Sequence, residues 1–227
     1  MSKSIVITID GPAASGKSTV ARQLAHKLNL VFLDTGAMYR AVTLAALEAD
    51  AALDDQAALE RIMDSQQFEF HAQNDGLGVS LNGQDVSEQI RDPQVTANVR
   101  YLADAPGIRA RLVKLQQAFA AEHAGIVTEG RDQGTVVFPD AALKIFLTAD
   151  PAERAKRRLA ELEAKGLRQS LAEMKQAVVE RDKGDRNREV GPLKSAPDAI
   201  HIDTTSMTLE EVVEAILRHA KDRIRGR

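Results

Sequence analysis

The sequence predicts an α/β fold in which helices cover a parallel sheet and a small antiparallel piece is inserted. Two patterns along the chain carry this prediction. Short runs rich in isoleucine, valine and leucine alternate with stretches of helical apolar spacing, which is typical of parallel strands joined through helices. Between them, one stretch has apolar residues at every second position followed by turn residues, which indicates hairpins.

The first elements follow this alternation in order. Residues 5–9 form a short run of apolar, mostly β-branched residues, which is typical of a buried strand. An aspartate and a glycine follow this run. Residues 17–28 carry apolar side chains at helical spacing. A second short strand at 31–34 and a second helix at 36–49 come next. This succession of elements predicts the parallel sheet.

The inserted piece begins after the second helix. Phe68 and Phe70 alternate with polar residues and lead to Asn-Asp-Gly, and Val79 and Leu81 alternate and lead to Asn-Gly. These dipeptides favour the tight turns of hairpins. Residues 87–123 then return to a helical pattern, which is interrupted at Asp-Ala-Pro-Gly.

The second half of the chain repeats the alternation of core strands and helices. The helix that follows the fourth core strand has an aspartate before proline at its start and a glycine at its end, which are ordinary helix boundaries. We expect strands at 125–130, 143–149 and 199–203, and helices at 150–166, 170–182 and 208–224.

The stretch "GPAASGKST" lies between the first strand and the first helix and matches G-x-x-x-x-G-K-[ST]. Small residues allow successive backbone N–H groups to face an anion, and the helix adds its positive N-terminal end. Lys17 is expected to reach the β- and γ-phosphates of ATP, and the Ser18 hydroxyl to ligate Mg²⁺. The predicted ATP-binding residues are Gly11, Pro12, Ala13, Ala14, Ser15, Gly16, Lys17, Ser18 and Thr19.

Composition excludes several classes of protein. The chain has 227 residues, 44% of them hydrophobic, and a net charge of −3, so it has no overall charge that favours nucleic acid or an anionic membrane. It has no cysteine, which excludes disulfides, zinc–thiolate sites and cysteine nucleophiles. No signal peptide and no run of 18 apolar residues is found. We expect a cytoplasmic protein, and modest size without coiled-coil heptads favours a monomer.

Other motifs separate the classes of phosphate-loop protein. The guanine-reading "NKxD" of GTPases and the "LSGGQ" of transporter ATPases are both missing. Arginines are frequent instead: Arg40 and Arg131 follow the ends of predicted parallel strands, where open α/β sheets bind ligands. Arginine binds phosphate through two parallel hydrogen bonds, and phosphoryl transfer depends mainly on positioning and charge. Arg154 and Arg158 share a helix face and repel each other unless an anion lies between them, which favours a phosphate there.

Five segments together resemble the bacterial cytidylate kinases, the (d)CMP kinases among the nucleoside monophosphate kinases. They are "GPAASGKST", "LDTGAMYR", "EGRDQGTVVFP", "ERDKGDRNR" and "PLKSAPDA", and the resemblance runs from Ile5 to the last helix. It implies a P-loop kinase with a five-stranded parallel sheet flanked by helices, a β-containing monophosphate-binding insert at about 36–102 and a helical lid at about 150–168. The whole chain, 1–227, would be one kinase unit.

The resemblance also implies a reaction and roles for residues. The enzyme would transfer the γ-phosphoryl group of ATP, with Mg²⁺, to CMP or dCMP. Arg40, Arg131 and Arg188 would hold the CMP phosphate, Arg181 and Asp185 would meet the sugar, Arg109 and Asp132 would read the cytosine, and Thr35 would supply a small hydroxyl. The residues expected to act on the transferred group are Lys17, Arg131, Arg154, Arg157 and Arg158. Arg100 stands where many relatives have serine near the base and is left out of the site.

Chemistry agrees with a phosphate as the acceptor. The second pKa of a phosphate monoester is about 6, so the attacking oxygen is ionised at neutral pH and needs no general base. A kinase acting on a hydroxyl wants an aspartate base, and Asp34 could serve. This leaves a small-metabolite kinase of the shikimate or gluconate type, or a nucleotide-binding regulator without transfer activity, as alternatives. With 6 Phe, 2 Tyr and no Trp, we expect the adenine to lie on aliphatic or guanidinium surface.

Overall fold

The computed structural model describes residues 4–73, 76–164 and 166–225. The chain divides into two compact units. One comprises residues 30–126 with the first four residues, and the other comprises residues 5–29 and 127–227. Within the described parts of the chain, no helix is long and apolar enough to cross a membrane.

A five-stranded sheet, in the order β2-β6-β1-β7-β8, forms the core and confirms the predicted fold class. Strand β1 pairs in parallel with β7, and β7 in parallel with β8. Aliphatic side chains form the centre of these strands, with Ile7, Ile9, Ile145 and Leu147 at most 1% exposed, while Asp10, Asp34 and Glu129 are buried polar residues at or near strand ends. The strands are β1 (Ile5–Asp10), β2 (Val31–Asp34), β6 (Gly125–Gly130), β7 (Leu143–Thr148) and β8 (Ile200–Asp203).

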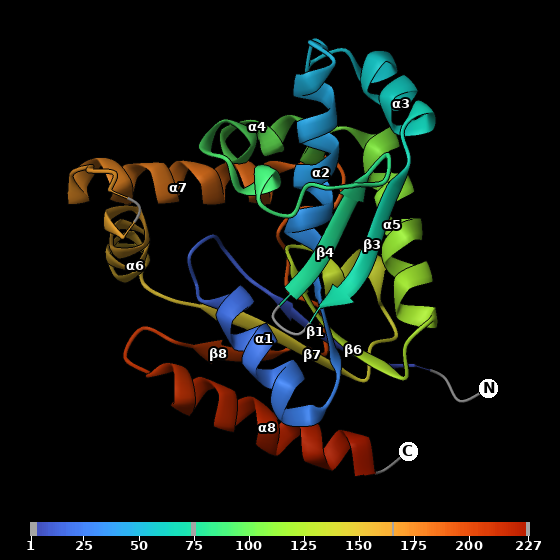
Figure 1. Cartoon of the computed structure of the whole chain (residues 1–227). Helices are drawn as coiled ribbons and strands as arrows, with labels where there is room; N and C mark the ends of the chain where they lie inside the picture. The colour runs from blue at the N-terminus through green and yellow to red at the C-terminus, as the bar shows by residue number, and fades with distance from the viewer. Residues whose placement is uncertain (1–3, 74–75, 165, 226–227) are drawn as a thin grey trace. The chain divides into compact units, whose positions relative to one another are not determined.

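Among its described residues, the unit that contains the phosphate loop has five helical elements beside its strands. Helices α1 and α8 pack together beside the strands, and α6 and α7 form a second pair (Figure 1). Between β6 and β7 the chain makes a short π-helical turn, η2. The bounds are α1 (Lys17–Leu28), η2 (Gln133–Val137), α6 (Pro151–Glu163), α7 (Leu171–Asn187) and α8 (Leu209–Arg225).

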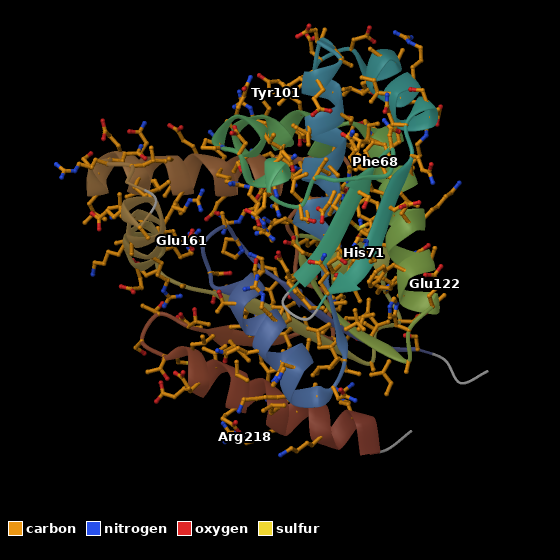
Figure 2. The ribbon with its side chains drawn as sticks, in the orientation of Figure 1. Phe68, His71, Tyr101, Glu122, Glu161 and Arg218 are labelled. Atoms are coloured by element: carbon orange, nitrogen blue, oxygen red, sulfur yellow. The ribbon has the colours of Figure 1, made fainter. Side chains whose placement is uncertain are left out.

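The other unit contains a three-stranded antiparallel sheet, β3-β4-β5, as the hairpin signals predicted. Asn82 and Gly83 form the second turn with positive φ angles of 52° and 79°, which suits Asn-Gly. The first turn falls on residues 74–75, outside the described residues. Phe68 and His71, labelled in Figure 2, come from β3. The elements are α2 (Thr35–Glu48), α3 (Gln56–Ser65), β3 (Phe68–Gln73), β4 (Gly76–Leu81), β5 (Gln84–Asp85), η1 (Gln89–Arg91), α4 (Pro93–Ala103) and α5 (Pro106–Ala121).

Two helices differ from the prediction. Helix α3 was not predicted, although Asp55 caps it by accepting a hydrogen bond from the Ala58 backbone at 3.0 Å. Helix α7 was expected to end at residue 182 but continues to Asn187. The extension places Asp182 and Asp185 on one helix, three residues apart and both buried.

Candidate active site

The phosphate loop joins β1 to α1 and has the backbone that the motif requires. Gly11 has φ 152°, and a Cβ there would lie only 2.1 Å from the Leu147 carbonyl oxygen, so no other residue fits. Ala14 and Gly16 are left-handed, with φ 57° and 88°. Gly16 is the N-cap of α1 and offers no capping side chain, so the first N–H groups of the helix are left to a ligand.

Lys17 is buried at the start of α1, with 5% of its surface exposed. Its ammonium folds back on the loop, donating to the Pro12 carbonyl at 2.6 Å and to Ser15 Oγ at 3.4 Å. Burial, and next the charge of Arg131, lower the pKa of Lys17 to about 7 against the opposing effect of Glu129. An incoming phosphate would therefore meet a desolvated ammonium beside an arginine.

The Ser18 hydroxyl donates to the Glu129 carboxylate at 2.9 Å. Glu129 is 8% exposed and stands near the end of β6. Hydroxyl and carboxylate oxygens are ligands that Mg²⁺ accepts, and this ion keeps several waters and takes few protein ligands when it binds nucleotide phosphates. The described residues hold no cluster of three or more His, Cys, Asp or Glu suited to a metal.

A carboxylate at the centre of an arginine cluster is the main feature of this unit. Asp185 accepts from Arg131 Nε and from Arg188 Nη2, both at 2.6 Å. Burial would raise the pKa of Asp185, but Arg131, Arg188 and the charge of Arg181 outweigh burial and lower it. Three arginines gathered at one carboxylate are an arrangement that suits a phosphate, because guanidinium groups bind phosphate through paired hydrogen bonds.

Arg154 is buried, with only 2% of its surface accessible, whereas a residue of a lid would be exposed. Its guanidinium forms a bidentate pair with Asp182 and donates to the carbonyls of Ala149 and Ala13, at 2.9 and 3.0 Å. Ala13 belongs to the phosphate loop. Arg154 therefore anchors the base of α6 to this loop and to α7.

The other two arginines of α6 have separate partners. Arg158 pairs with Glu161 at 2.6 Å and is 38% exposed. Arg157 donates to the Thr204 hydroxyl at 3.1 Å and to the Thr204 carbonyl at 2.7 Å. The expectation that Arg154 and Arg158 repel unless a phosphate lies between them is thus wrong, because each has its own carboxylate.

A hollow of about 390 Å³ lies between the phosphate loop, α1, α6 and the segment after β8. This volume is within the range of small-molecule pockets. Glu161, labelled on α6 in Figure 2, and Arg157 form its polar side. The lining residues are Ala14, Ser15, Gly16, Thr19, Val20, Glu153, Arg157, Glu161, Thr204, Met207, Leu209 and Val212.

In the other unit, Asp34 organises the start of α2. One of its oxygens caps the helix by accepting from the Ala37 backbone at 2.9 Å, and the other accepts from Arg40 Nη2 at 3.2 Å. Arg40 Nε is buried and has no hydrogen-bond partner within the described residues, so Arg40 keeps a donor for a ligand. Thr35, the first residue of α2, is 4% exposed.

Arg109 and Arg100 differ in their surroundings. Arg109 is buried on α5, donates to the Ala103 carbonyl at 3.2 Å, and has its guanidinium 5.7 Å from the centre of the Tyr39 ring. Arg100 is exposed on α4, and its guanidinium lies 4.9 Å from the centre of the ring of its neighbour Tyr101. Nothing in its contacts makes Arg100 part of a site.

Asp132 directly precedes the turn η2 and is 5% exposed. It lies close enough to Asp10 to raise the pKa of that carboxyl. Its neighbour Arg131 forms an ion pair with Asp185, with 2.6 Å between Nε and Oδ2.

Sequence reasoning found the loop and the arginines but missed the groups that hold them. Glu129 ends an apolar strand and could have been identified by that position. Asp182 stands among basic residues in "ERDKGDRNR", and Asp185 in the same segment was predicted to meet the sugar and not to hold arginines. Among the predicted residues, the structure joins Arg131, Asp185 and Arg188 directly, with Lys17 and Arg181 within electrostatic range. The missed residues are Asp10, Glu129, Asp182, Thr204 and Met207.

Comparison with known proteins agrees with this geometry. The family model for cytidylate kinase matches residues 7–222. A cytidylate kinase of Geobacillus sp. (strain WCH70) is 47% identical over 224 residues, 99% of this chain and 100% of that protein. One of Bacillus thuringiensis (strain Al Hakam) is 48% identical over 217 residues, 96% of each. A solved structure of an uncharacterized protein from Eubacterium ventriosum ATCC 27560 covers 97% of this chain and 99% of its own, at 16% identity and a TM-score of 0.53, and so shares the fold. The chain belongs to the cytidylate kinase family.

Proposed function

We propose that this protein transfers the γ-phosphoryl group of ATP to CMP or dCMP, giving ADP and CDP or dCDP. The observation that carries this proposal is the cluster of Arg131, Arg181 and Arg188 around Asp185, in the same unit as the phosphate loop. Transfer between two phosphates brings many anionic oxygens together, and arginines in fixed positions can neutralise them. The names of the relatives at 47% and 48% identity support the same reaction.

ATP would bind with its phosphates on residues 11–19 and its base in the hollow beside them. Val20, Met207 and Val212 offer aliphatic surface there, and Arg157 a guanidinium. This composition agrees with the expectation for the adenine. Lys17 would leave the Pro12 carbonyl and donate to the β- and γ-phosphates. The pKa of Lys17 would then rise, because neighbouring phosphate anions favour the charged ammonium.

Magnesium would bind at Ser18, with Glu129 as the neighbouring carboxylate. The ion would neutralise the charge on the β- and γ-phosphate oxygens. No other Mg²⁺ ligand is proposed.

The acceptor would be an ionised phosphate oxygen of CMP, which attacks the γ-phosphorus as the bond to the β-phosphate oxygen breaks. Arg131 and Arg188, held by Asp185, would orient the CMP phosphate, and Arg40 would add the free Nε donor. Each oxygen of Asp185 accepts from one arginine and keeps a lone pair with which it could accept from a sugar hydroxyl. Thr35, Arg109, Asp132 and Arg181 keep their predicted roles toward the sugar and base.

The predicted division of the chain, with an insert at 36–102 and a lid at 150–168, remains a prediction. Part of that lid, Lys165, lies outside the described residues. In the proposed mechanism, the lid moves about the buried anchor Arg154, and Arg158 approaches the transferred group as it closes. Cytoplasmic location and a monomeric state remain predictions from the sequence.

The alternatives are less well supported. Asp34 would be the base of a small-metabolite kinase, but both of its oxygens are bonded, one to the start of α2 and one to Arg40. A regulator without transfer activity has no need of Lys17 desolvated beside Arg131.

The test is ADP release coupled to a spectrophotometric signal, with ATP and each of CMP, dCMP, UMP, AMP and shikimate. We expect turnover with CMP and dCMP well above that with the other three. If shikimate is the one acceptor that gives ADP release, the metabolite kinase is supported. If ADP release does not depend on an acceptor, or if no ADP is released, the regulator is supported.

A further inference from the structure

We propose that Asp10 is a positioning residue for the nucleoside monophosphate: its carboxylate holds the backbone of residues 133–134 and so fixes Arg131 and Asp132. This inference rests on the proposed function, in which those two residues meet CMP. Asp10 itself contacts no substrate in this proposal. It is the last residue of β1, directly before the phosphate loop.

Two hydrogen bonds carry the inference. Asp10 Oδ1 accepts from the Gln133 N–H at 2.9 Å, and Oδ2 accepts from the Gly134 N–H at 2.7 Å. Asp10 is 4% exposed, so both bonds lie away from water. Each oxygen serves one donor, and an asparagine could satisfy only one, because its amide nitrogen would face the other N–H. The arrangement therefore requires a carboxylate.

Other contacts fix the same turn. Thr128 Oγ1 donates to Gln133 Oε1 at 2.9 Å in the buried core. Gly134 lies so close to the sheet that a Cβ would come within 3.0 Å of Thr8 Oγ1 and 3.2 Å of Lys144 Cδ. The turn η2 is thus held on three sides, and the two residues before it, Arg131 and Asp132, have little freedom.

The electrostatics show that this arrangement has a cost. Burial raises the pKa of Asp10 to about 6, with Asp132 adding to the rise, while the two backbone N–H groups and Lys17 oppose it. A buried negative charge beside a second carboxylate lowers the stability of the fold unless hydrogen bonds compensate for it. The hydrogen bonds of Asp10 go to the turn that carries the residues proposed to meet CMP.

The test is the kinetics of Asp10→Asn with ATP, CMP and UMP. We expect KM for CMP to rise about tenfold, and the CMP-to-UMP ratio of kcat/KM to narrow about fivefold or more, as expected for a displaced base-edge contact. KM for ATP should stay within about twofold. An equal rise in KM for ATP, or an unchanged selectivity ratio with a lower melting temperature, would overturn the proposal in favour of a purely structural role.

A matched control is Asp55→Asn, which removes a carboxylate that accepts a backbone N–H at the start of α3. Asparagine caps a helix about as well as aspartate, so this variant should leave the melting temperature, both KM values and the selectivity ratio nearly unchanged. If Asp10→Asn does not fold, Gly134→Ala displaces the same turn by a few tenths of an ångström through Thr8 and Lys144. It should raise KM for CMP and narrow the ratio in the same way, and unchanged values would overturn the proposal.

The double variant Asp10→Asn/Asp132→Asn separates this inference from the proposed function. The selectivity of the double variant should be no lower than that of Asp132→Asn alone, because both changes act on one contact. If Asp132→Asn leaves the CMP-to-UMP ratio unchanged, the base-reading role of Asp132 fails. The inference on Asp10 then depends on whether Asp10→Asn raises KM for CMP more than KM for ATP. If Asp132→Asn narrows the ratio and Asp10→Asn does not, only the inference on Asp10 fails.

Discussion

Arg154 and Asp182 form a buried bidentate pair that joins α6 to α7. The distances are 3.1 Å for Nη1–Oδ1 and 2.6 Å for Nη2–Oδ2, and the side chains are 3% and 4% exposed. The same guanidinium donates to the carbonyl of Ala13 in the phosphate loop. The pair therefore couples the helix predicted as a lid to the loop predicted to hold ATP.

Asp182→Asn should destabilise the protein by about 3 kcal/mol or more, because it leaves a buried guanidinium without its counter-charge. It should also raise KM for ATP, since Arg154 then holds Ala13 less firmly. Urea unfolding and steady-state kinetics measure the two effects. The control is Glu161→Gln, which breaks the exposed pair with Arg158 and should cost at most about 1 kcal/mol. Similar losses in both variants would contradict the role of the buried pair.

Lys17→Met should reduce phosphoryl transfer about 100-fold or more, because it removes a charge on the transferred group. Lys17 is buried, so the substitution should keep the volume of its side chain. Methionine keeps most of the volume and removes a charge that burial disfavours, so the melting temperature should not fall. Lys27→Met, which breaks an exposed pair with Glu214 on α8, is the control and should leave turnover unchanged. Normal turnover in Lys17→Met would argue against the phosphate loop.

Arg158→Ala should lower kcat about tenfold and leave the Kd for CMP within about twofold, because a residue on a closing lid contributes most in the transition state. Calorimetry with CMP and steady-state kinetics give the two values. Lys156→Ala on the same helix, at an exposed side chain, should change neither. A loss confined to CMP binding would show that α6 is not a lid over ATP.

The stability of Asp10→Asn relative to the unchanged protein should depend on pH. Asp10 faces Lys17 and Asp132, and its pKa is raised to about 6 from an ordinary 3.8. Between these values the folded protein holds a proton that the unfolded chain releases, so its stability falls as pH rises through this window and is constant above it. Asparagine does not titrate. Between pH 4 and 6, the free energy of unfolding of the unchanged protein should therefore fall by up to about 3 kcal/mol relative to that of the variant. This figure follows from about 1.4 kcal/mol per pKa unit. Urea unfolding across this range measures it, and a difference of opposite sign would show a carboxylate stabilised by folding.

The local features of the sequence predicted most of the fold. Helix α1 and strands β2 and β6 have the predicted bounds, because apolar spacing and adjacent turn residues define them. Helix α7 was ended too early because Gly184 and its charged neighbours favour an end there. Tertiary bonds from Asp182 to Arg154 and from Asp185 to Arg131 override that preference.

The partners of the site could not be predicted in this way. Ser18 and Glu129 are 111 positions apart, and Asp10 and Gln133 are 123 apart. Only the parallel sheet brings these strand ends together, and the sequence does not specify which acid meets which donor. The turn η2 has no sequence pattern of its own, and Asp10 and Thr128, which form hydrogen bonds with it, belong to the separate strands β1 and β6.

The last prediction concerns Asp132 and the choice of base. Cytosine offers an exocyclic amine where uracil offers a carbonyl oxygen, and an ionised carboxylate accepts hydrogen bonds but does not donate them. Asp132 would therefore attract cytosine and repel uracil. Asp132→Asn keeps the shape but can present either end of its amide. It should narrow the CMP-to-UMP ratio of kcat/KM by about five- to a hundredfold, equal to roughly 1–3 kcal/mol for one base-edge contact.

The competing role of Asp132 is an ion pair or a contact near the metal. Arg131 already pairs with Asp185 through Nε, and its other donors could pair with Asp132. KM for ATP should stay nearly unchanged in Asp132→Asn, and its titration with Mg²⁺ should match that of the unchanged protein. If both substrates slow equally and the Mg²⁺ requirement rises, Asp132 acts near the metal, and cytosine must be recognised by Arg109 and other residues instead.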